Sequence, residues 1–475
     1  MRSEFDKIVD ACSPAFKQMR IAERVRQLAY GLLTCYGRHT VTGMLTACGQ
    51  QFVDWTSAYK IFSKERIDMD KIFDVSSQSV LEELAPEQMM VAHMDDTIIK
   101  KTGKKVPGTA WRRDPLGPPF HTNFIWGQRF LQISMALSHS QGNCQSRAIP
   151  VDFHHCPTVK KPKKTAEADE ITIFKEEQRI AKLSRQGSLR IQALREKLNR
   201  QGAAHRQLFL SVDGSYTNET VLKKLPSKVT LIGRVQKDTK LYALPSEVQA
   251  TGRKKVYGEQ LPTPEQVRQS DSIAWQSVQA WAAGKIHKFN VKVIKDVRWR
   301  SAGQQHTLQL VVIKPLGYRL SKGSKILYRQ PAYLICTDSK LEIEKLLQAY
   351  LWRWEIEVNF RDEKTILGCG QAQVRNPMSA KNLPAFTAAM YAFMHLAAYR
   401  TNKNRDESVL PKAKWDPVNK NQRMTSSEII NLLRAQLWTN KEGLSFSGFV
   451  KNEHLNKRQR NTSNPCTAAL FYVRK

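Results

Sequence analysis

Residues 350–364 read YLWRWEIEVNFRDEK, and this stretch says most about how the chain folds. Its apolar residues recur at spacings of three and four, which predicts one long helix from about Lys340 to Leu367, closed by Gly368. On such a helix, one narrow face of about 60° carries four polar side chains. These are Tyr350, Arg353, Glu357 and Lys364.

The chemistry of that face suits a metal ion and phosphates. A phenol, a guanidinium, a carboxylate and an ammonium group are costly to bury within an apolar core. Glu357 could instead hold a metal ion, while Arg353 and Lys364 bind phosphates. The alternative is a solvated face on which Arg353 and Glu357 form an ordinary ion pair one helical turn apart.

Two upstream segments have strand character and end in acidic residues. Residues 88–101 read QMMVAHMDDTIIKK, and residues 208–218 read LFLSVDGSYTN. We expect the acids at these strand ends to meet Glu357 in space, although the three positions are far apart in sequence. Carboxylate oxygens favour Mg²⁺ or Mn²⁺, and two such ions ~3.5–4 Å apart stabilise both oxygens of a phosphoryl transfer. The alternative is that these Asp residues only cap turns.

The composition favours a folded protein that binds nucleic acid. The 475 residues include 75 Lys and Arg against 43 Asp and Glu, a formal net charge of +32, and 41% of them are apolar. So large a surplus of positive charge repels itself, and a polyanion relieves that repulsion. A membrane surface fits less well, because the basic residues are spread along the whole chain. One basic loop, with Arg253, Lys254 and Lys255, is predicted to contact DNA; otherwise it is a solvated loop.

Several other classes of protein are disfavoured by patterns that the sequence lacks. The eight Cys residues form no C-x-x-C pair, so we expect reduced thiols and no zinc finger. There is no P-loop, so no nucleotide cofactor is expected. The longest apolar run, at 388–399, is shorter than the ~20 residues of a membrane span, and residues 1–14 do not resemble a signal peptide. We therefore expect no membrane partner and a cytoplasmic location.

The order of the elements predicts an α/β core that is split by an insertion. A loop rich in Gly, Pro and basic residues is expected at about 101–124. The predicted segments are 1–87, a helical N-terminal DNA-binding domain; 88–235, the first part of the core with a basic helical segment at 157–206; 236–329, a β-rich insertion domain; 330–400, the second part of the core with the Glu-bearing helix; and 401–475, a C-terminal region and candidate for dimerisation.

The segment 350–364 resembles the signature of bacterial insertion-sequence transposases of the DDE cut-and-paste type, the insertion-sequence-four-like group. In that signature Tyr, Arg, Glu and Lys are separated by two, three and six residues, as they are here. MDDT at 94–97 is similar to the first-acid motif, in which the catalytic Asp directly precedes Thr, and VDGSYTN at 212–218 is similar to the second. The resemblance covers roughly residues 88–235 and 330–400.

The resemblance implies an RNase H-like catalytic core, interrupted by a β-rich insertion, with helical N-terminal and C-terminal regions. It implies that Asp96, Asp213 and Glu357 are catalytic and hold two Mg²⁺ ions, with Mn²⁺ as a substitute. Asp95 competes with Asp96, because adjacent strand residues face opposite sides of a sheet; the Asp–Thr pattern favours Asp96. Tyr333 is the candidate for stacking on a flipped base, and the alternative is an ordinary strand residue.

The implied activity is that of a DNA transposase, a metal-dependent endonuclease and strand transferase. Water attacks the phosphodiester at the element end, the 3′-OH so formed attacks the opposite strand to give a hairpin, and the reopened end is joined to target DNA. Tyr350, Arg353 and Lys364 would contact the DNA backbone. The implied partners are double-stranded DNA, with terminal inverted repeats and target sites, and a second protomer in a DNA-bound homodimer. Two other readings stay open: a non-catalytic DNA-binding repressor derived from a transposase, and a structure-specific nuclease of the same fold.

Overall fold

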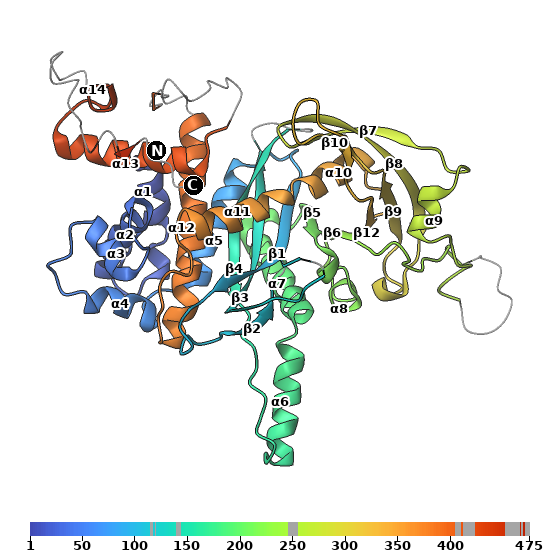
Figure 1. Ribbon diagram of the computed structural model, residues 1–475, viewed down its shortest axis with the longest axis horizontal. Helices are drawn as coiled ribbons and strands as arrows, with labels where there is room; N and C mark the ends of the chain where they lie inside the picture. The colour runs from blue at the N-terminus through green and yellow to red at the C-terminus, as the bar shows by residue number, and fades with distance from the viewer. Residues whose placement is uncertain are drawn as a thin grey trace.

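The computed structural model of the chain describes residues 1–114, 117–118, 120–138, 144–245, 255–403, 410–411, 423–451, 466 and 469–470. This part of the chain is a mixed α/β protein in which helices from both ends of the sequence gather beside one half of a long sheet (Figure 1). Residues 1–87 are helical, as their pattern predicts. Their α-helices are α1 (Arg2–Ala11), α2 (Met19–Thr34), α3 (Val41–Ala47), α4 (Thr56–Ser63) and α5 (Met69–Glu83).

Ten strands of the described residues form one sheet, in the order β2–β3–β1–β5–β6–β12–β9–β8–β7, with β4 paired to β3. Neighbours β1, β5 and β6 are parallel, and the other pairs are antiparallel. The strands are β1 (Met90–Lys100), β2 (Ala110–Arg113), β3 (Phe124–Ser138), β4 (Ser146–His155), β5 (Leu208–Val212), β6 (Val229–Arg234), β7 (Gln276–Ala282), β8 (Lys285–Val297), β9 (Leu308–Ile313) and β12 (Ala332–Cys336). A separate hairpin joins β10 (Gly317–Tyr318) to β11 (Leu327–Tyr328).

Helices cover both faces of the sheet at β1 and β5. On one face lies α7 (Leu183–Leu198), whose Gly187 leaves room for Met94 of β1: a Cβ at Gly187 would stand 3.2 Å from the Met94 methyl group. On the other face lie α10 (Ile343–Leu351) and α11 (Trp354–Thr365). There, Ser211 of β5 donates a hydrogen bond to the carbonyl of Ala349 at 2.9 Å. The apolar run that opens β1 is buried because neighbouring strands and helices enclose it on every side.

The helix α12 (Pro377–Lys403) is buried around most of its circumference. It packs against β4 of the sheet and against α1, α4 and α5, which explains why its sequence is apolar on all sides. Pro384 within this helix has no N–H, so the carbonyl of Ala380 lacks its usual helical donor; the Gln128 amide donates to it at 3.2 Å. No helix in the described residues, α12 included, has the length and apolar character that crossing a membrane requires.

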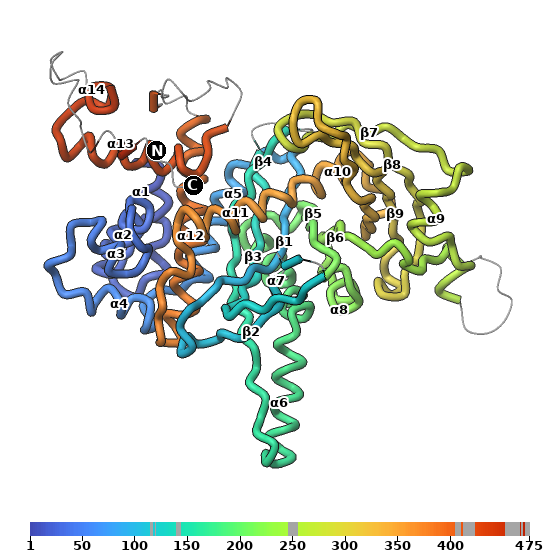
Figure 2. Tube along the Cα trace, viewed as in Figure 1, coloured from blue at the N-terminus to red at the C-terminus, as the bar shows by residue number. Residues whose placement is uncertain are grey.

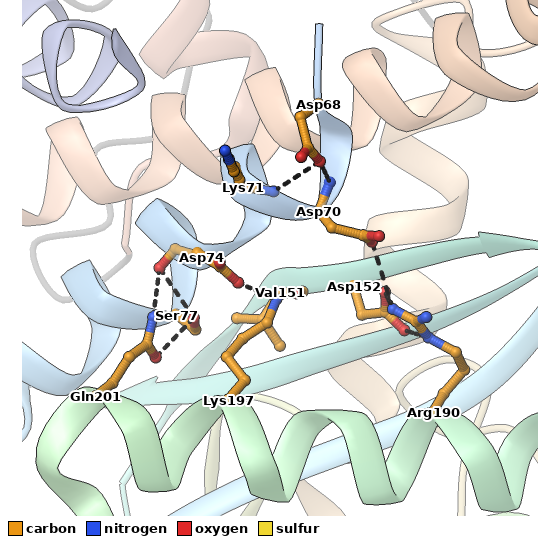
Figure 3. Close-up of polar contacts among 10 residues, drawn as sticks. All are labelled: Asp68, Asp70, Lys71, Asp74, Ser77, Val151, Asp152, Arg190, Lys197 and Gln201. Carbon is orange, nitrogen blue, oxygen red and sulfur yellow. Dashed lines mark hydrogen bonds and ion pairs between the residues drawn. The ribbon is translucent and has the colours of Figure 1, made fainter. Parts of the chain in front are cut away.

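A buried polar network joins the N-terminal helices to the core (Figure 3). Asp152 of β4 accepts a hydrogen bond from Nε of Arg190 on α7 at 2.7 Å. Lys197 of α7 lies 2.9 Å from the carboxylate of Asp74 on α5. One turn further, Gln201 donates to the Asp74 carbonyl at 2.8 Å. The ion pair between Asp74 and Lys197 thus helps to hold α5 and α7 together.

A helical arm projects from the body between β4 and α7 (Figure 2). It is formed by residues 157–167, which contain four exposed Lys residues, and by α6 (Ala168–Ile180), which has no buried side chain. The basic helical segment predicted at 157–206 is therefore two helices, of which α6 is exposed and α7 packs on the sheet.

The C-terminal helices are α13 (Ser426–Glu442) and α14 (Phe446–Lys451), and the start of α13 is joined to α11 by polar contacts. Both oxygens of Glu355 accept hydrogen bonds from Arg423, at 2.8 and 2.7 Å. The Ser426 hydroxyl donates to Asp362 at 2.5 Å. Glu355 therefore has a structural partner, whereas Glu357, two residues further along the same helix, is exposed.

Two sequence-based expectations for secondary structure are wrong. The loop predicted at 101–124 contains β2, which forms because the start of β3 extends past β1 and offers it a partner. The single helix predicted from Lys340 to Leu367 is two helices, interrupted at Trp352 and Arg353. The indole N–H of Trp352 donates to the carbonyl of Cys144 at 2.8 Å, a tertiary contact that helical periodicity does not reveal.

Candidate active site

Two parallel strands bring a pair of carboxylates together. The register of β1 and β5 places Met94 opposite Val212, so the next residues, Asp95 and Asp213, are neighbours where β5 ends. Adjacent strands lie ~4.8 Å apart, and residues in register share a face. Met94 and Val212 are buried in the core, so the two acids face the opposite side of the sheet.

That side is the one covered by α10 and α11. Thr97, two residues beyond Asp95 on β1, accepts a hydrogen bond from Nζ of Lys364 on α11 at 2.6 Å. Ser211, two residues before Asp213, bonds to α10 as described above. Because strand side chains alternate between faces, both contacts place Asp95 and Asp213 toward these two helices.

Arg353, at the break between α10 and α11, connects the helices to the acids. Its Nη1 donates to Oδ2 of Asp95 at 3.0 Å, and both side chains are only 15% exposed. The guanidinium also lies 5.8 Å from the ring centroid of Tyr350. Its Nε is buried and has no hydrogen-bond partner among the described residues. The position before α11 therefore holds a cation with one donor still unused.

Three acids lie near enough to this cation to affect its pKa. Burial alone would lower the pKa of Arg353, but the Tyr350 ring and the nearby carboxylates raise it. Those carboxylates are Asp95, Asp213 and Glu357. Burial raises the pKa of Asp95 to about 7, although Arg353 opposes the shift. A carboxyl with so high a pKa is poised to change charge near neutral pH, as functional carboxyls often are.

Asp96 lies on the opposite face of β1. It accepts a hydrogen bond from the hydroxyl of Tyr216 at 2.9 Å, and its carboxylate lies 3.3 Å from Nε of Arg129. Strand alternation turns Asp96, the residue that the resemblance favours, away from Arg353 and toward the α7 side, whereas Asp95 faces α10 and α11. The Asp–Thr pattern could not decide this, since it says nothing about which face the helices cover.

The other predicted site residues are distributed as follows. Glu357 is exposed on α11, within the electrostatic reach of Asp95 and Arg353. Lys364 is bonded to Thr97, and burial lowers its pKa. Tyr333 of β12 is buried, and its hydroxyl donates to Glu265 of α9 (Pro264–Gln269), so the structure does not bring it to Arg353. Arg253 and Lys254 lie outside the described residues, and Lys255 is exposed.

One buried acid beneath the site was missed by the sequence analysis. Glu363 of α11 is 1% exposed, and burial raises its pKa to about 8, although Lys364 opposes the shift. It faces Gln132 of β3 at 3.2 Å when the Gln132 amide is turned to donate. The signal that could have found it is the run of polar residues at 361–364, which leaves no apolar residue for the buried face of that turn.

The donors at this site are carboxylate oxygens, which are the ligands that Mg²⁺ and Mn²⁺ prefer. Within the part of the chain that the structure describes, no three His, Cys, Asp or Glu side chains are grouped closely enough to form a metal site. The type of donor atom fits a divalent cation, whereas the spacing of the described carboxylates does not enclose one, and the positive charge at Asp95 is that of Arg353.

The sheet thus carries two acids on adjacent parallel strands, with a cation bound to the first of them. Residues 13–306 match the family model described as DDE superfamily endonuclease. This span is more than half of the chain, and the chain therefore belongs to the DDE superfamily endonucleases, whose substrate is DNA. The match includes Asp95 and Asp213 and ends before α11. Comparison with curated proteins finds no match.

Proposed function

We propose that the chain is a DNA transposase of the insertion-sequence-four-like group, with Asp95, Asp213 and Glu357 as its catalytic carboxylates. The observation that carries this proposal is the register of β1 and β5, which sets Asp95 beside Asp213 on the face covered by α11. The spacing of Tyr350, Arg353, Glu357 and Lys364 supports the choice of group. The family match supports the endonuclease activity itself.

The proposed fold of the core is RNase H-like. This proposal is supported by a mixed sheet in which the parallel strands β1 and β5 lead to Asp95 and Asp213. It is also supported by the later helix α11, which carries Glu357. Between them, residues 236–329 supply β7, β8 and β9, which we propose to be the β-rich insertion domain. Residues 1–87 form the proposed DNA-binding domain, and residues 401–475 the proposed dimerisation region.

Asp95, Asp213 and Glu357 would hold two Mg²⁺ ions, with Mn²⁺ as a substitute. When bound, the ions supply a nucleophilic water near neutral pH and stabilise charge on the scissile phosphate. Arg353 binds the Asp95 carboxylate and is proposed to exchange it for a phosphate oxygen of the DNA. A guanidinium suits this exchange, because it binds carboxylates and phosphates with the same geometry.

The remaining polar residues of the helices position the DNA backbone in this proposal. Lys364 is held at Thr97, on the same face of β1 as Asp95, where an ammonium group attracts a phosphate. Tyr350 keeps the Arg353 guanidinium over its ring. Tyr333 lies away from Arg353 and lines a cavity together with Glu265 and Arg268. We propose Tyr333 only as a contact to a displaced base that enters this cavity.

The proposed reaction begins with hydrolysis at the end of the element, which releases a 3′-OH. That hydroxyl attacks the opposite strand to form a hairpin, and after reopening it is joined to target DNA. Two ends must be joined, so we propose a homodimer on DNA that binds terminal inverted repeats, in the cytoplasm of a bacterium. The net charge of +32 supports a polyanionic partner of this size.

The test is cleavage of a duplex that carries the element end, with and without Mg²⁺. Asp213→Asn and Glu357→Gln should each reduce cleavage by at least about 10³-fold, because a metal ligand is lost, while DNA affinity in EDTA stays within about twofold. Cleavage that persists in either variant, or in EDTA, would contradict the catalytic assignment. Equal cleavage of branched DNA without terminal repeats would instead indicate a structure-specific nuclease.

A further inference from the structure

The ribbon formed by β2 and the start of β3 carries its aromatic residues on one face. Trp111 pairs with Trp126, and Arg113 pairs with Phe124. Paired residues on antiparallel strands share a face, so these four side chains lie on the same side. We call this set, Trp111, Arg113, Phe124 and Trp126, the aromatic ribbon face.

Much of the aromatic ribbon face is open to solvent. Trp111 is 66% exposed and Phe124 is 61% exposed, while Arg113 is also exposed. The rings of Trp111 and Trp126 pack edge to face, 5.6 Å apart. The indole N–H of Trp126 donates to the carbonyl of Gly103 at 3.3 Å, which fixes its ring. A rigid cluster of large exposed rings marks a binding surface.

The aromatic ribbon face lies on the same side of the sheet as the candidate active site. On β3, Gln132 pairs with Asp95, and Phe130 pairs with Thr97. Even-numbered positions of this part of β3, which include Trp126 and Phe124, therefore share the face of Asp95. Lys100 of β1 pairs with Gly127 of β3, which directly follows Trp126 in sequence. Along β1, Lys100 is five residues from Asp95, a separation of ~17 Å at ~3.4 Å per residue.

The charge around the ribbon is strongly positive. Residues 100–124 include six Lys and Arg residues and a single acid, Asp114. Lys104, Lys105 and Arg113 are exposed, and none of them forms an ion pair within the described ranges of the chain. Aromatic rings interleaved with basic side chains are typical of surfaces that bind single-stranded nucleic acid, where rings stack on bases and cations follow the backbone.

We propose that the aromatic ribbon face binds single-stranded DNA next to the cleavage site, by stacking unpaired bases on Trp111 and Phe124. The inference rests on the proposed function, because it takes DNA as the substrate of the neighbouring acids. Bases of an intact duplex hide their faces in the stack, so the ligand must be an overhang or a frayed end. Arg113, Lys104 and Lys105 bind the phosphates of the same strand.

The experiment compares two fluorescent probes with the full-length chain in EDTA, where no cleavage interferes. One probe is a blunt 30-base-pair duplex and the other is the same duplex with a ten-nucleotide single-stranded extension that contains 2-aminopurine. The Trp111→Ala/Phe124→Ala double variant should bind the extended probe about 10- to 100-fold more weakly than wild type. Its affinity for the blunt probe should change less than about threefold. Quenching of 2-aminopurine on binding should be lost.

Two further variants serve as controls. Trp111→Phe keeps a stacking ring and should restore most of the affinity lost in Trp111→Ala. Tyr328→Ala removes a ring that is 69% exposed on β11, outside the ribbon, and should leave both affinities unchanged. Thermal unfolding of each variant confirms that the fold is kept.

Several outcomes would overturn the inference. An equal loss on both probes, or no loss on either, rules out stacking of unpaired bases. A change in oligomeric state by light scattering, with unchanged DNA affinity, would show that the ribbon binds protein. Because these measurements need no cleavage, they are independent of the Asp213→Asn and Glu357→Gln test, and failure of the proposed function is recognised separately.

Discussion

The guanidinium of Arg353 donates to the carboxylate of Asp95 at 3.0 Å, across two elements that are more than 250 residues apart in the chain. This ion pair links the sheet to the break between α10 and α11, and it is the reason for proposing Asp95 as the first acid of the site. The neighbour of Asp95 in sequence, Asp96, takes part in a different set of contacts on the other face of β1.

These two neighbours provide a matched pair of variants. Asp95→Asn should reduce metal-dependent cleavage by at least about 10³-fold, because a proposed metal ligand is lost. Asp96→Asn should keep cleavage within about tenfold of wild type and lower the melting temperature by a few degrees, because Arg129 loses its charged partner. Cleavage rates and thermal unfolding measure both. The opposite ranking of the two cleavage rates would return the catalytic role to Asp96.

Cleavage should depend on pH through Asp95. Its pKa lies near 7, so its carboxylate form, which alone binds a cation, increases as pH rises from 5 to 7 and is complete above about 8. Rates at limiting Mg²⁺ should therefore rise about tenfold per pH unit below 7 and level off above it. Arg353→Gln removes the cation that opposes the shift, so the midpoint of the profile should move to higher pH. A midpoint that moves to lower pH would contradict the assigned ion pair.

Glu363 should make stability depend on pH. Its pKa is raised from an ordinary value of 4.5 to about 8, so the folded state favours the protonated form. The unfolded state binds fewer protons between these two values, and the free energy of unfolding should fall as pH rises from about 5 to 8. Glu363→Gln removes this contribution, and urea unfolding at pH 5 and pH 8 measures the difference. An unchanged pH dependence in the variant would show that another group is responsible.

The network between α5 and α7 predicts unequal effects of two Asp residues. Asp152→Ala should lower the free energy of unfolding by about 3 kcal/mol, because Arg190 remains largely buried without its main partner. Asp70, whose side chain is 76% exposed and 3.6 Å from Arg190, is the matched control. Asp70→Ala should change stability by less than about 0.5 kcal/mol. Similar losses in both variants would mean that the exposed carboxylate carries the interaction.

Much of the core could be read from the sequence because its signals are local. The strand predicted within residues 88–101 coincides with β1, and the predicted strand that leads to Asp213 coincides with β5. The helix break at Trp352 coincides with a tertiary hydrogen bond to Cys144, and β2 pairs with the part of β3 that extends past β1, so neither feature has a local signal in the sequence. The choice between Asp95 and Asp96 required the register with β5, because alternation alone says only that the two differ.

The place of β12 also determines when the molecule can fold during synthesis. In the sheet, β12 lies between β6 and β9. The ribosome must add about 100 residues after β6 before β12 can pair with the free edge of β6, and this synthesis takes roughly 5–20 s. An unpaired strand edge invites association with other chains. A nascent chain therefore already contains Asp95 and Asp213 while it still lacks α11, and it acquires Glu357 only after β12 has been made.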